Sequence, residues 1–239
     1  MDTLHIYTVG GDTVILAGGV SLDEIENSGE EILKNAPMHV QAGFIASTEI
    51  KIPRMVCAAN VLSADCALCF GAYLSEISEK KSQFTISSTG VDTPFCVSVD
   101  TMAQNGTLLL AAKAKTVLTA AVPSVLFGGC EYFIAEGEMP ENAEDFLAEL
   151  SENSTAEATA LLCKQEQNIT AFFRQKERCV CGFSAGSAAI ALAFYESDSS
   201  RDYFKAVYRF EKGEREVEIK RFLSEAFDAK LSAKIEKRG

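Results

Sequence analysis

The pattern of apolar and polar positions near the start of the chain recurs at its middle. The first copy is Tyr7–Gly19, in which apolar runs flank a Gly-Gly pair, and the second is Val125–Gly137, with the same pair between similar runs. Gly128 follows Gly10 by 118 residues, and the same offset relates the glycines that end the two copies. Because self-similarity at a fixed spacing is the mark of a repeated unit, we predict two similar halves with a site between them.

The same elements are predicted after each copy. An acidic helix is expected at 21–35, where a Ser-x-x-Glu capping box precedes an apolar stripe, and another at 140–150, where a proline stands near the first turn. Two strand-like stretches follow in each half. They lie at 41–47 and 49–57 in the first half, and at 158–164 and 168–173 in the second.

Two runs rich in small residues, 63–74 and 181–195, are too long and too rich in alanine for strands, so we expect buried helices there. A hairpin should close each half, with strands at 84–90 and 95–99 in the first and at 204–210 and 214–219 in the second. The prediction is an α/β fold of two pseudo-symmetric domains. Their expected ranges are 1–117 and 118–239.

Composition narrows the class of protein. The chain has 239 residues, 47% of them hydrophobic, so it can bury a sizeable core. A net charge of −12 with scattered Lys and Arg argues against a nucleic-acid or anionic-membrane partner, and the basic tail at 230–238 is too short to change this. No export signal or membrane-spanning run is visible, because charges and a proline interrupt the most apolar stretch, 107–127. A cytoplasmic location is expected.

Eight cysteines at irregular spacing indicate free thiols in a reducing compartment more than a disulfide framework. Cys66-Ala-Leu-Cys69 and Cys179-Val-Cys181 resemble half of a zinc site. The only histidines are His5 and His39, and no second Cys-x-x-Cys pair stands at zinc-like spacing. No metal is therefore expected.

The segment Gly182-Phe-Ser184-Ala-Gly186 matches the G-x-S-x-G nucleophile elbow of serine hydrolases. That site needs a histidine later in the chain, and none follows His39. The hydrolase interpretation is therefore weak.

Cys181 offers a second interpretation of the same segment. A thiol at a helix N-terminus is acidified by unpaired N–H groups and by the positive end of the helix dipole. Gly182 and Gly186 would let a substrate carboxylate approach those N–H groups. This arrangement suits proton abstraction next to a carboxylate. The alternative is that Cys181 is a small buried packing residue and that the glycines serve close packing.

Three motifs make the chain resemble the diaminopimelate epimerase superfamily of cofactor-independent racemases, epimerases and isomerases. The stretch Tyr7-Thr-Val-Gly-Gly-Asp-Thr-Val-Ile-Leu16 resembles the family's opening G-x-G-N-D-F strand. Ala67-Leu-Cys-Phe-Gly-Ala-Tyr73 resembles the stretch after its first C-G-N-G motif, and Glu177-Arg-Cys-Val-Cys-Gly182 resembles its E-T-x-A-C-G motif. The resemblance spans nearly the whole chain and implies two domains, each with a β-sheet wrapped around a central helix.

The resemblance implies two facing cysteines, one removing a proton and the other returning one on the opposite face. Cys181 falls on the second-domain cysteine. Subtracting 118 gives Ser63, whereas the nearest thiol is Cys66, and a self-alignment of Ser63 with Ser184 at offset 121 is an alternative. A free serine has too high a pKa to act as a base at neutral pH without help. If Ser63 is the partner, the protein is a one-base isomerase or dehydratase, or it is inactive.

The resemblance also implies a site for a small carboxylate substrate and no cofactor. The predicted substrate-binding residues are Gly11, Asp12, Asn60, Arg174, Gly182, Phe183 and Ser184. The residues that would recognise the far end of diaminopimelate are not visible, so the substrate stays open. A homodimer is an open alternative to a monomer. The competing hypothesis is a noncatalytic protein of the same fold that binds a small molecule or assembles with partners.

Overall fold

The structure is a computed structural model. It describes residues 4–9, 12–17, 49–52, 64–77, 83–88, 95–100, 103–118, 122–175, 183–197, 201–211 and 213–238. Several predicted features lie outside the described residues: the helix at 21–35, the strand at 41–47, Gly11, Asn60, Ser63, Cys181 and Gly182. For Asp12 and Cys66 the structure describes the main chain alone.

Residue contacts divide the chain into two compact units. The first unit is Met1–Leu110 together with Ser232–Gly239, and the second is Ala111–Leu231. Strands β6 (Asn105–Lys113) and β14 (Ala226–Arg238) pass through these limits, so each unit contains part of both strands. The boundary expected at residue 117 stays a prediction.

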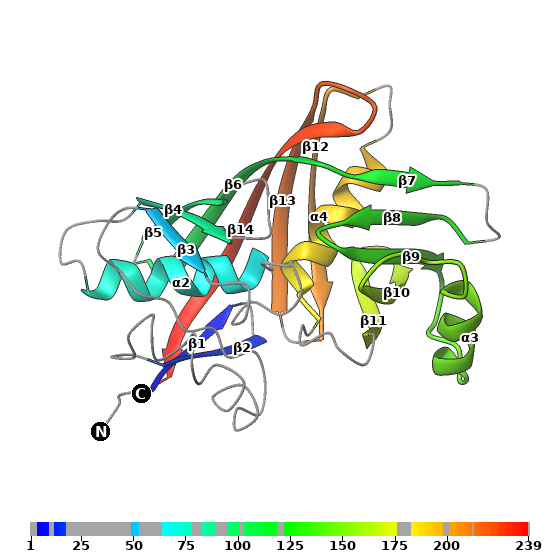
Figure 1. Cartoon of the computed structure of the whole chain (residues 1–239), viewed down its shortest axis with the longest axis horizontal. Helices are drawn as coiled ribbons and strands as arrows, with labels where there is room; N and C mark the ends of the chain where they lie inside the picture. Colours follow the sequence, from blue (N-terminus) through cyan, green and yellow to red (C-terminus); the bar gives the residue numbers. More distant parts are fainter. Residues whose placement is uncertain are drawn as a thin grey trace. The chain divides into compact units, whose positions relative to one another are not determined.

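The first unit is a mixed sheet with one described helix, α2 (Ala64–Ile77) (Figure 1). Its strands follow the order β3-β4-β5-β6-β14, and β1 continues the sheet from β14 to β2. The new strands are β1 (Leu4–Val9), β2 (Asp12–Ala17), β3 (Glu49–Ile52), β4 (Gln83–Ser88) and β5 (Phe95–Asp100). The β3–β4 pair is parallel, and α2 lies between these two strands in the chain.

The second unit contains α3 (Ala143–Leu150) and α4 (Ala185–Glu196) (Figure 1). Its strand order is β14-β13-β12-β11-β10-β9-β8-β7. These strands are β7 (Lys115–Val117), β8 (Ser124–Phe127), β9 (Cys130–Glu136), β10 (Ala158–Gln165), β11 (Asn168–Gln175), β12 (Tyr203–Phe210) and β13 (Gly213–Arg221). Two strand pairs joined through a helix are parallel here: β9–β10 through α3, and β11–β12 through α4.

Helix α4 is buried on all sides from Ala185 to Phe194. Five of these ten residues are alanines, and Gly186 and Ser187 are also small, so strands can approach the helix closely. Helix α2 likewise buries Ala64, Ala67 and Leu68. The two buried helices predicted from the small-residue runs are therefore confirmed, with α4 beginning at Ala185.

The local arrangement of strands recurs in the two units with fixed offsets. The β1–β2 hairpin pairs Val9 with Asp12, and the β8–β9 hairpin pairs Phe127 with Cys130. Each residue of the second pair follows its counterpart in the first pair by 118 positions. Each unit then continues with a parallel strand–helix–strand connection and an antiparallel hairpin, β4–β5 in the first and β12–β13 in the second. Both of the predicted closing hairpins are confirmed.

The last strand of each half makes an equivalent bond. In the second unit the Ala114 N–H donates to the Glu225 carbonyl at 2.9 Å, and in the first the Ile235 N–H donates to the Gln104 carbonyl at 2.8 Å. The donors differ by 235 − 114 = 121 and the acceptors by 225 − 104 = 121. The offset is therefore 118 in the opening hairpins and 121 by the end of each half.

Residues 230–238, described above as a basic tail, belong to strand β14, which the sequence analysis did not predict. Its apolar positions alternate, and Phe227, Ala229, Leu231, Ala233 and Ile235 are all buried. Lys230 and Lys234 occupy the other face of the strand, as the period of two requires. The strand takes its place by pairing with residues far away in the sequence, β1 among them.

Candidate functional site

The start of α4 is the described part of the predicted site. Ser184 is the N-cap residue: its backbone is extended, and its hydroxyl accepts a hydrogen bond from the Ser187 N–H at 3.2 Å. Ser184 is buried, at 7% exposure. This hydroxyl therefore caps the N-terminus of the helix in the way that serine side chains commonly do. Its predicted role in substrate binding stays a prediction.

The electrostatics of this helix end favour a negative group. The first turn of α4 carries no acidic side chain. Its main-chain N–H groups and the helix dipole therefore present a positive end that no carboxylate of the helix's own first turn offsets. Cys181 precedes the cap by three positions in the sequence.

Phe183, which directly precedes the cap, packs between two other aromatic rings. Its centroid lies 6.1 Å from that of Phe173 on β11 and 6.1 Å from that of Phe210 at the end of β12. All three side chains are half-buried. The structure thus brings one predicted site residue into an apolar group with two that the sequence did not indicate. Only the pairing of β11 with β12 could have revealed them.

Arg174 is not part of this aromatic group. It follows Phe173 on strand β11, so its side chain leaves the opposite face of the sheet, and it is exposed. Phe172, on that opposite face, packs against the cluster of Phe133, Leu147, Leu161 and Cys163. The structure therefore places Arg174 away from Phe183, and its proposed contact with a carboxylate stays a prediction.

In the first unit the structure describes two predicted residues: Asp12, which begins β2, and Cys66, which lies near the start of α2. Cys66 is the third residue of this helix, and the neighbouring Asp65 is buried, at 3% exposure. Cys69, one turn further, is a buried thiol. Among the residues that the structure describes, no cluster of three or more His, Cys, Asp or Glu could hold a metal ion.

The other end of α4 is surrounded by polar side chains that sequence analysis missed. Arg221 donates to the Phe194 carbonyl at 2.6 Å and to the Ser197 hydroxyl at 2.8 Å. Glu196 accepts a hydrogen bond from the Tyr208 hydroxyl at 2.7 Å and lies 2.5 Å from the Lys164 ammonium. Burial lowers the pKa of Lys164, but the hydrogen bond and charge of Glu196 outweigh it and raise this pKa overall.

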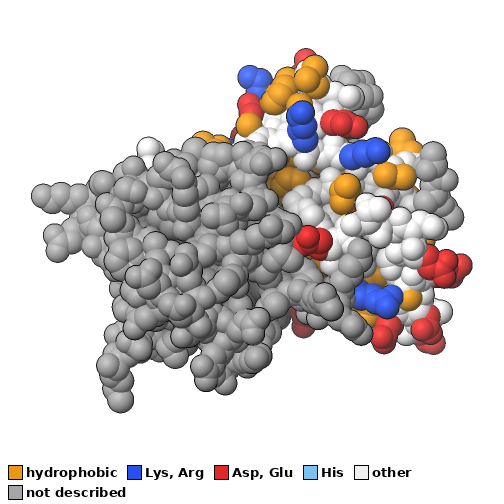
Figure 2. All heavy atoms as spheres, viewed as in Figure 1, with side chains coloured by type: hydrophobic (Ala, Val, Ile, Leu, Met, Phe, Trp, Pro, Cys, Tyr) orange, Lys and Arg blue, Asp and Glu red, His pale blue; other side chains and the backbone are white. Residues whose placement is uncertain are grey.

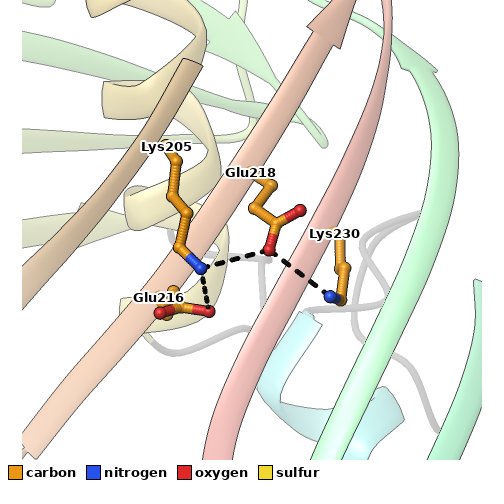
Figure 3. Close-up of polar contacts among 4 residues, drawn as sticks. All are labelled: Lys205, Glu216, Glu218 and Lys230. Atoms are coloured by element: carbon orange, nitrogen blue, oxygen red, sulfur yellow. Dashed lines mark hydrogen bonds and ion pairs between the residues drawn. The ribbon is translucent and has the colours of Figure 1, made fainter. Parts of the chain in front are cut away.

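The outward face of strands β12, β13 and β14 carries a separate charged network (Figure 3). Lys205 contacts Glu216 at 3.0 Å and Glu218 at 3.3 Å, and Lys230 contacts Glu218 at 3.4 Å. Desolvation raises the pKa of Glu218, but its hydrogen bonds to the two lysines lower it overall. On the face in Figure 2, charged and apolar side chains are interspersed over the described surface. These features are typical of a solvated sheet face.

Comparison with solved structures shows which fold these elements form. A hydroxyproline epimerase from Agrobacterium vitis, solved with trans-4-hydroxy-L-proline bound, matches with a TM-score of 0.66 at 12% identity, covering 100% of this chain and 91% of its own. A PhzC/PhzF-type protein from Clostridium difficile, assigned to phenazine biosynthesis, matches at 0.65 and 9%, covering 100% and 98%. The chain has the diaminopimelate epimerase-like fold.

A third structure, described as a probable proline racemase from Agrobacterium radiobacter with carbonate bound, has a TM-score of 0.61 at 14% identity, covering 100% of this chain and 92% of its own. No protein-family model matches the sequence, and neither does any curated protein. No helix within the described ranges is long and apolar enough to cross a membrane. These structural matches establish the diaminopimelate epimerase-like fold, but identities this low do not fix a reaction.

Proposed function

We propose that the protein is a cofactor-independent isomerase of the racemase or epimerase type, acting at the carbon next to a carboxylate. The observation that carries the proposal is the start of α4, where Ser184 caps a buried helix without acidic residues in its first turn. Cys181 stands just before that cap, in the stretch Glu177-Arg-Cys-Val-Cys-Gly182. The fold shared with a hydroxyproline epimerase and with a protein described as a probable proline racemase supports this reaction class.

In the proposed reaction the Cys181 thiolate removes the proton from the α-carbon. The C–H bond breaks, an S–H bond forms, and the electron pair stays on the substrate as a carbanion conjugated with the carboxylate. The main-chain N–H groups of Gly182, Phe183 and Ser184 would hold that carboxylate. Delivery of a proton to the opposite face of the α-carbon by a second group completes a racemisation or epimerisation. Return of the proton by the same thiol completes an isomerisation only when the proton goes to another carbon of the conjugated anion.

The described helices indicate which residue of the first half corresponds to Cys181. Helix α2 begins at Ala64 and α4 at Ala185, an offset of 185 − 64 = 121. At that offset Cys181 corresponds to Asn60. An amide side chain cannot exchange a proton with carbon, so this register supports a one-base isomerase with Asn60 as a binding group.

The same offset assigns roles to the other two candidates. Ser63 corresponds to the helix cap Ser184, and Cys66 corresponds to Ser187, whose N–H is the one capped. We therefore propose Ser63 as a cap and leave Cys66 as the alternative second acid or base. Gly11 and Asp12 are proposed to complete the substrate site from the first half.

We also propose that the two halves, 1–117 and 118–239, arose by duplication and form pseudo-symmetric domains with a β-sheet around a central helix. The matched hairpin registers and the two main-chain bonds related by 121 support this origin. Random similarity of one Gly-Gly pair would not extend to hydrogen bonds at the far end of each half. A cytoplasmic location and a homodimer stay predictions.

Deuterium wash-in tests the proposed reaction. The protein is incubated in deuterated water with a panel of amino acids and hydroxy acids, and mass spectrometry measures deuterium at the α-carbon. We expect incorporation into at least one acid and its loss in Cys181→Ala. Cys163→Ala is the matched control, because that thiol is 1% exposed and packs in a core cluster, so the control should keep the exchange.

Chiral chromatography of the same samples separates the mechanisms. Deuterium entering with retained configuration indicates one base, whereas the appearance of the opposite enantiomer indicates two. If no acid in the panel exchanges, the isomerase proposal is wrong. Ligand binding without exchange would then favour the noncatalytic alternative, which the asparagine in register with Cys181 also suits.

A further inference from the structure

Arg221 binds the C-terminal end of α4 through three kinds of contact. Its guanidinium donates to the Phe194 carbonyl at 2.6 Å and to the Ser197 hydroxyl at 2.8 Å, and it lies 4.1 Å from the centroid of the Phe194 ring. Ser197 in turn donates to the same carbonyl at 2.8 Å. A further bond to the Ser224 carbonyl at 2.9 Å ties the guanidinium to the turn after β13. The end of the helix is therefore fixed to strand β13.

The helix itself does not supply favourable charge at this end. Its last turn contains no basic residue, and it does contain Glu196. A carboxylate there interacts unfavourably with the helix dipole, because the C-terminal end of the dipole is already negative. The compensating cations come from neighbouring strands, Arg221 from β13 and Lys164 from β10. Together with Glu196, these two cations give the side chains around the helix end a net charge of +1.

This arrangement has a consequence at the opposite end of α4. A negative C-terminal end would partly cancel the positive potential of the N-terminal end, and a cation bound to the last carbonyls removes that cancellation. We infer that Arg221 is a positioning residue for the candidate site: it anchors α4 by its C-terminal carbonyls and strengthens the positive potential at the helix start that follows Cys181. The inference rests on the proposed function for its effect on chemistry.

The expected size of the effect follows from distance. Twelve residues of α-helix span about 18 Å. For a thiol at the helix start, a unit charge at about that distance, at an effective dielectric constant of about 20, changes the ratio of thiolate to thiol about three- to fivefold. This corresponds to about half a pKa unit. Arg215, which lies on the same face of β13 and is buried, stays unchanged in every variant below.

The test compares Arg221→Met, which removes the charge, with Arg221→Lys, which keeps it but loses the planar fork. Arg209→Met is the matched control, since Arg209 is half-exposed and pairs with Glu214 at 2.8 Å. It follows Tyr208 on β12, so its side chain leaves the opposite face of the strand from Tyr208, which contacts Glu196. Alkylation by iodoacetamide is measured from pH 5 to 10, and peptide mass spectrometry reports the rate at Cys181. Urea unfolding is measured in parallel.

We expect Arg221→Met to raise the pKa of Cys181 by about half a unit, and Arg221→Lys and Arg209→Met to leave it unchanged. Both Arg221 variants should lose stability, because both lose hydrogen bonds. Equal pKa shifts in the Met and Lys variants, or no shift in either, would overturn the inference. An ordinary Cys181 pKa in the unchanged protein would count against the proposed function instead, and the charge-dependent shift would still be measurable.

Discussion

At the scale of single residues, Tyr208 makes the stability of the fold depend on pH. Its side chain is 1% exposed, and its hydroxyl donates to Glu196. Burial, and then the charge and hydrogen bond of Glu196, raise the pKa of Tyr208 far above its usual value of about 10. The folded protein therefore keeps the neutral phenol. This stabilisation is complete below about pH 10 and is lost as pH rises further, because the unfolded chain ionises the tyrosine there.

Tyr208→Phe should lower the free energy of unfolding by about 1–2 kcal/mol at pH 8, through the lost hydrogen bond. Between about pH 10 and 11.5 the difference should shrink by about 1.4 kcal/mol per pH unit, since the variant lacks this ionisation. Urea unfolding at several pH values measures both. Tyr203→Phe, at a side chain that is 58% exposed, is the control and should change little. A difference independent of pH would contradict this account.

The residues of the candidate site differ in how far sequence could predict them. Cys181 and Phe183 were proposed from a local motif, the neighbours of each along the chain, and their roles in the site stay predictions. Phe173 and Phe210 carry no local signal, because they reach Phe183 through the pairing of β11 with β12. Arg174 looked suitable by charge alone, yet strand alternation places it on the opposite face from Phe173.

At the scale of elements, Gly106 lets β6 approach β14 and α2. A Cβ added there would meet Ile235 Cδ1 and would lie 3.1 Å from a methyl carbon of Leu68. Both of these side chains are buried, at 5% and 0% exposure, so neither has free space into which to move. The close contact of the two strands therefore depends on the missing side chain.

Gly106→Ala should cost about 1–3 kcal/mol of stability through overpacking. Ile235→Val removes the carbon that the new Cβ would meet and should itself cost about 0.5–1.5 kcal/mol. The double variant should lose less unfolding free energy than the two single variants lose together. Urea unfolding of the four proteins, the unchanged chain included, measures this coupling. Strict additivity would show that the two groups do not meet.

Elements with local signals were predicted well. The β12–β13 hairpin turns at Gly213, whose φ of +146° suits glycine, and the small-residue runs became α2 and α4. Strand β14 was missed, although Phe227, Leu231 and Ile235 alternate with polar residues. Its lysines led to its description as a basic tail. Its partner β13 directly precedes it, but its other partners, β6 and β1, lie far away in the sequence, where no local pattern points to them.

At the scale of the whole molecule, the last residues of β14 belong to the first unit. They pair with β1 from Ile6–Arg238 to Val9–Ile235. A chain ending at Leu231 should therefore lose amide protection in β1, while β9 and β10 of the second unit keep theirs. Hydrogen exchange with peptide mass spectrometry measures this, with a chain lacking Gly239 alone as the control. Equal loss of protection in β9 and β10 would contradict the division into units.

The assignment of residues 232–238 to the first unit also bears on synthesis. Ala111–Leu231, which makes up the second unit, is continuous in sequence and leaves the ribosome before the strand that the first unit still lacks. The usual order, in which the N-terminal part folds first during translation, is therefore reversed for the completion of this protein. Residues 4–9 must wait, with one strand edge unpaired, until residues 235–238 have been made.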